Sequence, residues 1–208
     1  MHGNTNGDAG SRTIRGFRFF SALLTEPEQF RIIDDIRDVA AAAPLFEPVT
    51  PSGKRMSVRM TSAGSLGWVA DRKGYRYQPT HPSGRPWPPI PESVLDVWRR
   101  IAECKTEPDS CLVNLYGQNA RMGMHQDADE ANLAWPVVSI SLGDDALFRV
   151  GNKTRGGTTE SVWLRSGDVV VMGGSARLLH HGVDRIKFGT SRLLAKGGRL
   201  NLTLRVAG

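Results

Sequence analysis

Apolar side chains recur at helical spacing in two segments of the first half of the chain. In residues 25–43 they fall three or four positions apart, as on one helix face, at Phe30, Ile33, Ile36 and Ala40. Thr25 followed by Glu28 forms a capping-box pattern at the start of this segment, and Pro44 ends it. The segment 91–104 repeats the pattern with Val94, Leu95, Trp98, Ile101 and Ala102. The sequence therefore predicts two helices.

The second half of the chain has the pattern of short strands. From Cys111 onward, apolar runs are separated by turns that contain Gly or Asp; the runs are CLVNLY, PVVSISL, ALFRV, SVWL, DVVVM and RLNLTLRV. This spacing favours a barrel or a two-sheet sandwich over alternating βαβ units. Because the helices come first and the strands later, we predict an α+β, mainly β fold.

The length of 208 residues fits a single domain. Residues 1–12 are rich in Gly, Asn and Asp, so we expect a disordered tail there and one domain over residues 13–208. Within that domain the segment 45–90, rich in Gly, Pro, Arg and aromatic residues, differs in composition from the strand-rich core 111–208.

Composition also indicates where the protein works. The chain contains no run of about 18 apolar residues, the length that a membrane-spanning helix needs. Its beginning lacks the apolar stretch of a signal peptide. Its two cysteines, Cys104 and Cys111, form no CxxC pair, which is typical of reduced thiols. We therefore expect a cytoplasmic protein that acts as a monomer, away from membranes.

The net charge of +6 is moderate, and its distribution is more informative than its size. Residues 53–77 hold one acid, Asp71, against six bases: Lys54, Arg55, Arg59, Arg72, Lys73 and Arg76. The same segment contains aromatic residues and a predicted strand at Arg55–Met60. Two interpretations remain open. One is a solvated basic loop; the other is a lid that holds phosphate with cations and stacks aromatic rings on bases.

One pattern of side chains predicts a metal site. His125 and Asp127 form a His-x-Asp pair, and side chains two apart on a strand share a face. A third ligand could come from His181 or from its neighbour His180, and the pattern alone does not decide between them. Two histidines and one carboxylate are the ligand set of non-haem Fe(II) oxygenases, whereas a Zn site more often has four protein ligands.

The last predicted strand carries a second chemical signal. In RLNLTLRV the leucines share one face, and Arg199, Asn201, Thr203 and Arg205 share the other. If this polar face is covered, its two guanidinium groups need an anion, and a short dicarboxylate would suit the planar fork of Arg. The alternative is the exposed polar face of an edge strand.

Together these segments resemble the AlkB family of nucleic-acid dealkylases, which depend on Fe(II) and 2-oxoglutarate. The resemblance covers roughly Met56 to the C-terminus and rests on three motifs in order. They are NLYGQNARMGMHQDADE at residues 114–130, SGDVVVMGGSARLLHHG at residues 166–182 and RLNLTLR at residues 199–205. The fold that it implies is a double-stranded β-helix, a jelly roll, with buttressing helices and a nucleotide-recognition lid.

The resemblance also implies roles for individual residues. By it, His125, Asp127 and His181 ligate Fe(II), with His181 chosen because it directly precedes Gly182. Residues implied to contact 2-oxoglutarate are Asn114, Tyr116, Arg199, Asn201 and Arg205. Residues implied to contact the alkylated base or its strand are Met60, Trp68, Tyr75, Asp129, Glu130 and Arg155. Met172 departs from the family pattern, because some relatives carry Trp there.

The function that this resemblance implies is oxidative demethylation of N-alkylated bases, such as 1-methyladenine and 3-methylcytosine, with Fe(II) as metal and 2-oxoglutarate and O₂ as cosubstrates. Alkylated DNA is the expected partner, with RNA as a further substrate, and the process would be direct-reversal repair. One alternative keeps the cosubstrate but hydroxylates a protein or small molecule. Another is a nucleic-acid-binding protein without enzymatic activity, which would need neither the metal ligands nor the paired arginines.

Overall fold

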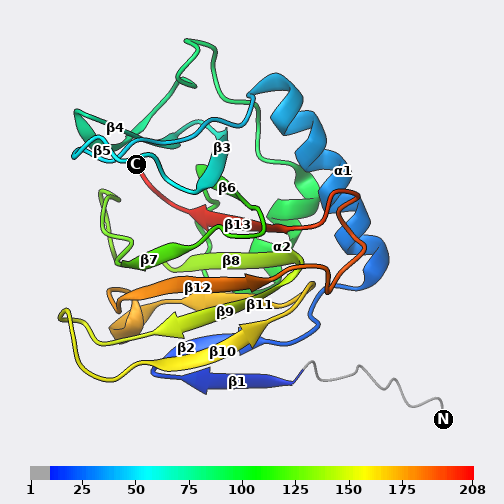
Figure 1. Cartoon of the computed structure of the whole chain (residues 1–208), viewed down its shortest axis with the longest axis vertical. Coiled ribbons are helices and arrows are strands. Elements are labelled where there is room, and N and C mark those ends of the chain that lie inside the picture. Colours follow the sequence, from blue (N-terminus) through cyan, green and yellow to red (C-terminus); the bar gives the residue numbers. More distant parts are fainter. Residues whose placement is uncertain (1–9) are drawn as a thin grey trace.

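Two antiparallel sheets face each other in the computed structural model, which describes residues 10–208 (Figure 1). The larger sheet contains, in spatial order, β1 (Ser11–Ile14), β2 (Phe17–Phe20), β11 (Val169–Met172), β8 (Val137–Gly143), β13 (Arg199–Arg205), β6 (Ser110–Tyr116) and β3 (Val58–Gly64). The smaller contains β10 (Glu160–Leu164), β9 (Asp145–Val150), β12 (His181–Lys187) and β7 (Met122–His125). A hairpin of β4 (Gly67–Asp71) and β5 (Gly74–Gln78) stands apart.

Two apolar clusters hold these layers together. One lies between the sheets and includes Phe17 and Met60 from the larger sheet and Phe148 from the smaller. The other lies on the opposite face of the larger sheet, where α1 (Glu26–Ala42) and α2 (Glu92–Ile101) cover it (Figure 1). The predicted fold class, a jelly roll with buttressing helices, is confirmed.

The first predicted helix is confirmed with its cap, but its buried face differs from the prediction. Thr25 is the N-cap, and it forms the reciprocal capping box with Glu28. The buried side chains are Ile32, Ile33, Ile36 and Val39. Phe30 lies 46% exposed, so the stripe predicted through it was wrong by part of a turn. The second helix is shorter than the predicted segment 91–104, since it ends at Ile101.

The strand boundaries also correct the sequence interpretation at two places. The predicted strand 55–60 begins only at Val58 and continues to Gly64. Residues 1–9 of the predicted tail lie outside the described residues, whereas Ser11 and Arg12 belong to β1. Among residues 10–208, no helix has the length and apolar character that crossing a membrane requires.

Strand β13 occupies the interior of the larger sheet, between β8 and β6. All seven of its residues are buried, so the polar face of RLNLTLR is covered rather than exposed on an edge. Its apolar side chains point toward the helices, while Arg199, Asn201 and Arg205 belong to the face between the sheets, where Asn201 and Arg205 line a cavity. The position of β13 therefore places two guanidinium groups inside the protein.

The centre of β13 is a position where we expect a substitution to reduce stability strongly. Leu202 is fully buried in the cluster under the helices. Replacement of Leu202 by Ala should lower the free energy of unfolding by about 2–5 kcal/mol, because it removes buried methyl groups and leaves a cavity. Urea unfolding followed by circular dichroism measures this loss. Leu147→Ala on β9, where the side chain is only half-buried, is the matched control and should cost less.

Candidate active site

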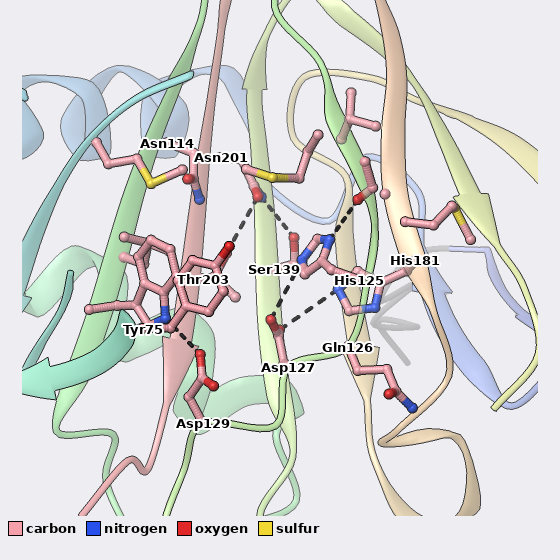
Figure 2. A pocket seen from close by; sticks show the side chains of 18 of the residues that line it. Tyr75, Asn114, His125, Gln126, Asp127, Asp129, Ser139, His181, Asn201 and Thr203 are labelled. Carbon is pink, nitrogen blue, oxygen red and sulfur yellow. Dashed lines mark hydrogen bonds and ion pairs between the residues drawn. The ribbon is translucent and has the colours of Figure 1, made fainter. Parts of the chain in front are cut away.

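A cavity of about 440 Å³ opens between the two sheets and reaches the β4–β5 hairpin (Figure 2). Its walls come from both sheets, with Asn114 on β6, Ser139 on β8 and Asn201 on β13 facing His125 and His181 on the smaller sheet. Most of the residues that the sequence singled out line this one space.

His125, Asp127 and His181 come together at one wall of the cavity (Figure 2). One ligand atom from each lies within 4.8 Å of the others. His125 Nε2 is 3.7 Å from Asp127 Oδ1, and His181 Nε2 is 3.8 Å from Asp127 Oδ2. Two imidazole nitrogens and one carboxylate can thus converge on a single metal ion, while the rest of the ion's coordination sphere faces the cavity.

The backbone brings the two histidines together because β7 and β12 are paired at these residues. His181 is the register partner of His125. The imidazole Nδ1 of His125 lies 2.8 Å from the Gly123 carbonyl, and that of His181 lies 3.1 Å from the Leu179 carbonyl. With Nδ1 as the donor to a carbonyl, Nε2 of each ring is left for a metal.

Gly182, which follows His181, permits this close approach. A Cβ atom at Gly182 would lie 2.6 Å from the Met122 carbonyl oxygen and 2.8 Å from that of Gly123. Real Cβ atoms do not approach backbone oxygens so closely, so any side chain here would push β12 away from β7. The glycine after the histidine is therefore a steric requirement of the paired strands.

The charges at the site favour the ionisation states that a metal needs. Burial alone would raise the pKa of Asp127, but Arg205 and the two nearby histidines hold that pKa well below its usual value. Burial, followed by repulsion from His125, lowers the pKa of His181 to about 4. At neutral pH the triad thus offers a carboxylate and a neutral buried imidazole, the forms that bind metals.

The adjacent His180 has a different environment. Its Nδ1 lies 3.0 Å from the Asn152 carbonyl oxygen, and its side chain is absent from the lining of the cavity. His181, by contrast, lines the cavity and faces Asp127. Of the two histidines that the pattern left open, the geometry brings His181 into the site.

Asp127 reaches the site by a route that strand pleating does not explain. Strand β7 ends at His125, so Asp127 lies in the loop beyond it. The expectation that both ligands share one face of a strand was therefore wrong. Arg205 Nη2 instead donates to Asp127 Oδ2 at 2.8 Å, so part of the position of this carboxylate is set by β13.

The predicted cosubstrate residues lie on adjacent strands β6 and β13. Asn114, Tyr116, Asn201 and Arg205 line the cavity. Asn114 is the register partner of Asn201, and Tyr116 that of Arg199. Asn201 donates from Nδ2 to the hydroxyl of Ser139 at 2.7 Å and so is anchored to β8.

Arg199 lies deeper than the others and is not part of the cavity lining. It is 1% exposed, its guanidinium lies 5.3 Å from the centre of the Tyr116 ring, and Nη2 donates to Ser141 Oγ at 2.9 Å. Its Nε and Nη1 have no hydrogen-bond partner among residues 10–208. Burial lowers the pKa of Arg199, which indicates the energetic cost of a buried cation without a paired anion.

These unpaired polar atoms fit a bound diacid. Besides Arg199, the buried Asn114 Oδ1 and Arg205 Nη1 have no partner within the described chain. Buried polar groups are nearly always satisfied in native proteins, so these guanidinium donors, together with the amide oxygen of Asn114 as an acceptor, indicate a ligand that is present in the working protein. A carboxylate at each end would supply acceptors for both guanidinium groups. The residues present therefore fit Fe(II) at the triad and 2-oxoglutarate beside it.

The mouth of the cavity carries the predicted base-binding residues. Trp68 and Tyr75, from β4 and β5, stack with ring centres 5.6 Å apart and an interplanar angle of 15°. Trp68 Nε1 donates to Asp129 Oδ2 at 2.8 Å. Met60 and Arg155 also line the cavity. A flat aromatic surface next to a carboxylate is thus held at the cavity entrance.

Glu130 lines the cavity but is engaged by other protein groups. Its side chain is 1% exposed and lies 2.9 Å from Arg177 Nη2 and 3.0 Å from Arg205 Nε. Tyr77 on β5 donates its hydroxyl to Glu130 Oε1 at 2.9 Å. Burial raises the pKa of Tyr77, so this hydroxyl keeps its proton. Glu130 therefore connects the hairpin, β13 and Arg177.

Sequence analysis missed several residues of the site. Thr203 lines the cavity, and the alternation of RLNLTLR had already placed it on the polar face. Ser139 and Tyr77 line it as well, but a lone Ser in an apolar run and one Tyr in a basic segment gave no signal. All methionines among the described residues also line it: Met56, Met60, Met122, Met124 and Met172.

The family model of the 2OG-Fe(II) oxygenase superfamily matches residues 16–205 of the chain. An alpha-ketoglutarate-dependent dioxygenase AlkB homolog of Caulobacter vibrioides is 51% identical over 93% of this chain and 89% of its own length. The alpha-ketoglutarate-dependent dioxygenase AlkB of Escherichia coli is 42% identical over 96% of this chain and 91% of its own.

More distant relatives and one solved structure are also similar to this chain. A DNA N(6)-methyladenine demethylase, ALKBH1D, of Arabidopsis thaliana is 30% identical over 91% of this chain and 49% of its own length. Among solved structures, that of OsALKBH1 superposes with a TM-score of 0.79 and 32% identity, covering 94% of this chain and 99% of that one.

Proposed function

Because the chain belongs to the AlkB family of the 2OG-Fe(II) oxygenase superfamily, we propose that it removes alkyl groups oxidatively from bases in nucleic acid. The enzyme class follows from the family: a dioxygenase that uses Fe(II), 2-oxoglutarate and O₂. The proposed substrates are N-alkylated bases in DNA, such as 1-methyladenine and 3-methylcytosine, with RNA as a further substrate. The biological role is direct-reversal repair of alkylated DNA.

His125, Asp127 and His181 are the proposed metal ligands, since their ligand atoms alone among the described His, Cys, Asp and Glu side chains converge in this way. Bound Fe(II) would activate O₂ with electrons from 2-oxoglutarate, so that succinate and CO₂ form and the oxidised methyl group leaves as formaldehyde. The contribution of the protein is to hold the reacting C–H bond and the cosubstrate in fixed positions.

Arg199 and Arg205 are proposed to bind the two ends of 2-oxoglutarate. Arg199, beside Tyr116, would pair with the distal carboxylate through its unpartnered Nε and Nη1. Arg205 and Asn114 would lie near the end that chelates the metal, because Arg205 already contacts Asp127. Asn201, between them on β13, would be a further contact. The diacid would thus supply an anion for Arg199, which has none among the described residues, and a further acceptor for Nη1 of Arg205.

The observation that carries the choice of substrate is the pair of Trp68 and Asp129 at the mouth of the same cavity. A target base must leave its stack before chemistry can reach it, and an aromatic ring offsets part of that cost by stacking. A methyl group on N1 of adenine or N3 of cytosine makes the ring cationic. A carboxylate beside an aromatic surface is therefore the environment that favours such a base.

The cavity mouth also carries the means to hold a phosphate backbone. Tyr75 lines the cavity and is 48% exposed, and the turn of the same hairpin carries the exposed Arg72 and Lys73. Arg155, in the loop between β9 and β10, also lines the cavity. Cations of this kind supply affinity for nucleic acid that does not depend on sequence and that weakens with salt.

Formaldehyde release from a panel of oligonucleotides tests the proposal. The panel contains 1-methyladenine, 3-methylcytosine and unmodified bases, each as single-stranded and double-stranded DNA and as RNA. We expect formaldehyde only with methylated bases and only when Fe(II), 2-oxoglutarate and O₂ are all present. If the protein consumes 2-oxoglutarate but no methylated oligonucleotide stimulates it, the hydroxylase of a protein or small molecule becomes the better assignment. Oligonucleotide binding without any consumption would favour a binding protein.

The stacking surface gives a further prediction. Trp68→Ala should raise the KM for a methylated oligonucleotide by roughly 5- to 150-fold, because base–aromatic stacking contributes about 1–3 kcal/mol per base. Steady-state kinetics of formaldehyde release measures this effect. Trp163→Ala is the matched control, since Trp163 on β10 is 38% exposed and lies outside the cavity. Equal KM values for both variants would remove Trp68 from the proposed base site.

We further propose that residues 13–208 form a single working domain, active as a monomer in the cytoplasm. Both cysteines are free, and Cys111 is buried, which supports a reducing compartment. All parts of the proposed site come from this one chain. Light scattering coupled to size-exclusion chromatography tests the monomer: a mass near 22.8 kDa is expected, and twice that mass would contradict it.

A further inference from the structure

The position of the Asp127 side chain is not fixed by regular secondary structure. Asp127 lies beyond the end of β7, in a loop that continues to Pro136, where β8 follows. Yet its carboxylate must lie within reach of both His125 and His181, which come from two different strands. The side chains that fix this stretch therefore bear on whether the three ligand atoms converge.

Arg177 contacts this stretch at both ends. Its Nη1 donates to the backbone carbonyl of Asp127, and its Nε donates to the carbonyl of Trp135 at 3.0 Å. Its Nη2 forms the ion pair with Glu130 at 2.9 Å. One guanidinium thus joins the two ends of the segment 127–135. Such planar, multiply bonded contacts are geometrically specific, and Lys cannot reproduce them.

Gln126 makes the reverse connection. Its side chain is directed away from the two imidazoles (Figure 2), and its Nε2 donates to the carbonyls of Leu178 and, at 3.1 Å, of Lys153. Arg177 therefore binds the backbone of residue 127, while Gln126 binds the backbone of residue 178. These reciprocal bonds connect the segment with His125 and Asp127 to the segment that leads into His181.

Arg177 lies outside the cavity in which the substrate and 2-oxoglutarate would bind. It is 4% exposed and is absent from the residues that line the cavity, so it touches neither the space for the base nor the space for 2-oxoglutarate. It lies behind Asp127 and four residues before His181. Any effect on the reaction must therefore pass through the residues that Arg177 holds.

We propose that Arg177 is a positioning residue that, together with Gln126, sets the spacing of the two ligand segments and so the affinity for the metal. The inference rests on the proposed function, in that it takes the triad as the metal site. Groups that orient metal ligands from behind typically change metal affinity or activity by 10- to 100-fold when they are removed. We expect a change of about that size for Arg177→Met.

Metal binding to the full chain, measured apart from turnover, tests this role. Titration with Mn(II), followed by electron paramagnetic resonance of the free ion, gives a dissociation constant without any reaction. Arg177→Met should weaken Mn(II) binding about 10- to 100-fold, and Arg177→Lys should recover only part of the loss. Arg100→Met, which removes an arginine bound to Glu28 and to the Leu23 carbonyl far from the site, is the matched control and should bind Mn(II) like the original protein.

Thermal unfolding of the metal-free proteins separates positioning from a general structural role. An Mn(II) dissociation constant within twofold of the original, whatever the change in unfolding temperature, would overturn the inference. If Arg177→Met does not fold, Gln126→Leu removes the reverse connection and decides the question by the same criterion. If the original protein itself fails to bind Mn(II), the metal site in the proposed function is wrong, which is a different result from equal binding by protein and variant.

Discussion

Asp127→Ala is expected to reduce formaldehyde release from methylated oligonucleotides below detection, even with excess Fe(II). Asp127 supplies the only carboxylate of the proposed triad, and its ligand atoms lie within 4.8 Å of those of both histidines. Removal leaves two imidazoles and also deprives Arg205 of its 2.8 Å partner. The substitution thus removes an anion from the proposed metal site and leaves the buried cation Arg205 without one of its partners.

Asp127→Asn distinguishes loss of the ligand from loss of the fold. The amide keeps the shape of the side chain and removes its charge, so we expect a folded protein with the same loss of turnover and much weaker Mn(II) binding. Asp184→Asn, an exposed carboxylate on β12 that pairs with Arg149, is the control and should keep full activity. Full activity of Asp127→Ala with added Fe(II) would refute the triad assignment.

Arg199→Met is expected to raise the KM for 2-oxoglutarate by about 10- to 150-fold for each hydrogen bond lost, since bonds to charged groups contribute about 1.5–3 kcal/mol. The stability of the fold should fall less than the affinity for 2-oxoglutarate does. Among residues 10–208, Arg199 is a buried cation without a carboxylate partner, and Met replaces it with an unbranched apolar side chain. Replacing buried charged groups by well-packed apolar ones is often neutral or stabilising.

A raised KM for 2-oxoglutarate together with nearly unchanged stability would identify Arg199 as part of a binding site. Kinetics at varied 2-oxoglutarate and thermal unfolding without 2-oxoglutarate measure the two effects on the same protein. Arg192→Met, in the exposed part of the loop before β13, is the control and should change neither. A large loss of stability with an unchanged KM for 2-oxoglutarate would show that Arg199 is structural and that the diacid binds elsewhere.

The alternation of the last strand predicted more of the protein than any other segment. It separated the leucines that pack under the helices from the polar residues between the sheets. It could not say whether the polar face was covered, because that depends on the strand being placed between β8 and β6. Strand order is a long-range property, and one strand read alone carries no record of its neighbours.

Local patterns failed where tertiary contacts override them. The stripe through Phe30 fitted helical spacing, but the sheet surface under α1 selects Ile32 and Val39 instead. The strand rule placed Asp127 beside His125 for the wrong reason, since Asp127 lies beyond the end of β7 and its carboxylate is bound by Arg205, 78 positions away. Arg177 had no pattern at all, because its partners are backbone carbonyls that any sequence would offer.

The resemblance to a known family supplied part of what local patterns could not, since it implied His181 rather than His180 as the ligand. The structure adds a physical reason, because only His181 faces Asp127 across the paired strands β7 and β12. It also places Glu130 between Arg177 and Arg205, whereas the resemblance implied only a substrate contact or its support. Roles of single side chains inside such a charge cluster depend on three-dimensional contacts that no motif records.

Mass spectrometry of a treated oligonucleotide tests the central claim most directly. A strand with a single 1-methyladenine is incubated with the protein, Fe(II), 2-oxoglutarate and O₂, and both the strand and the succinate are quantified. We predict that the strand loses the mass of one methylene group, with one succinate formed for each methyl group removed, and that Asp127→Asn leaves the strand unchanged. A strand that keeps its methyl group while the original protein consumes 2-oxoglutarate would contradict the claim.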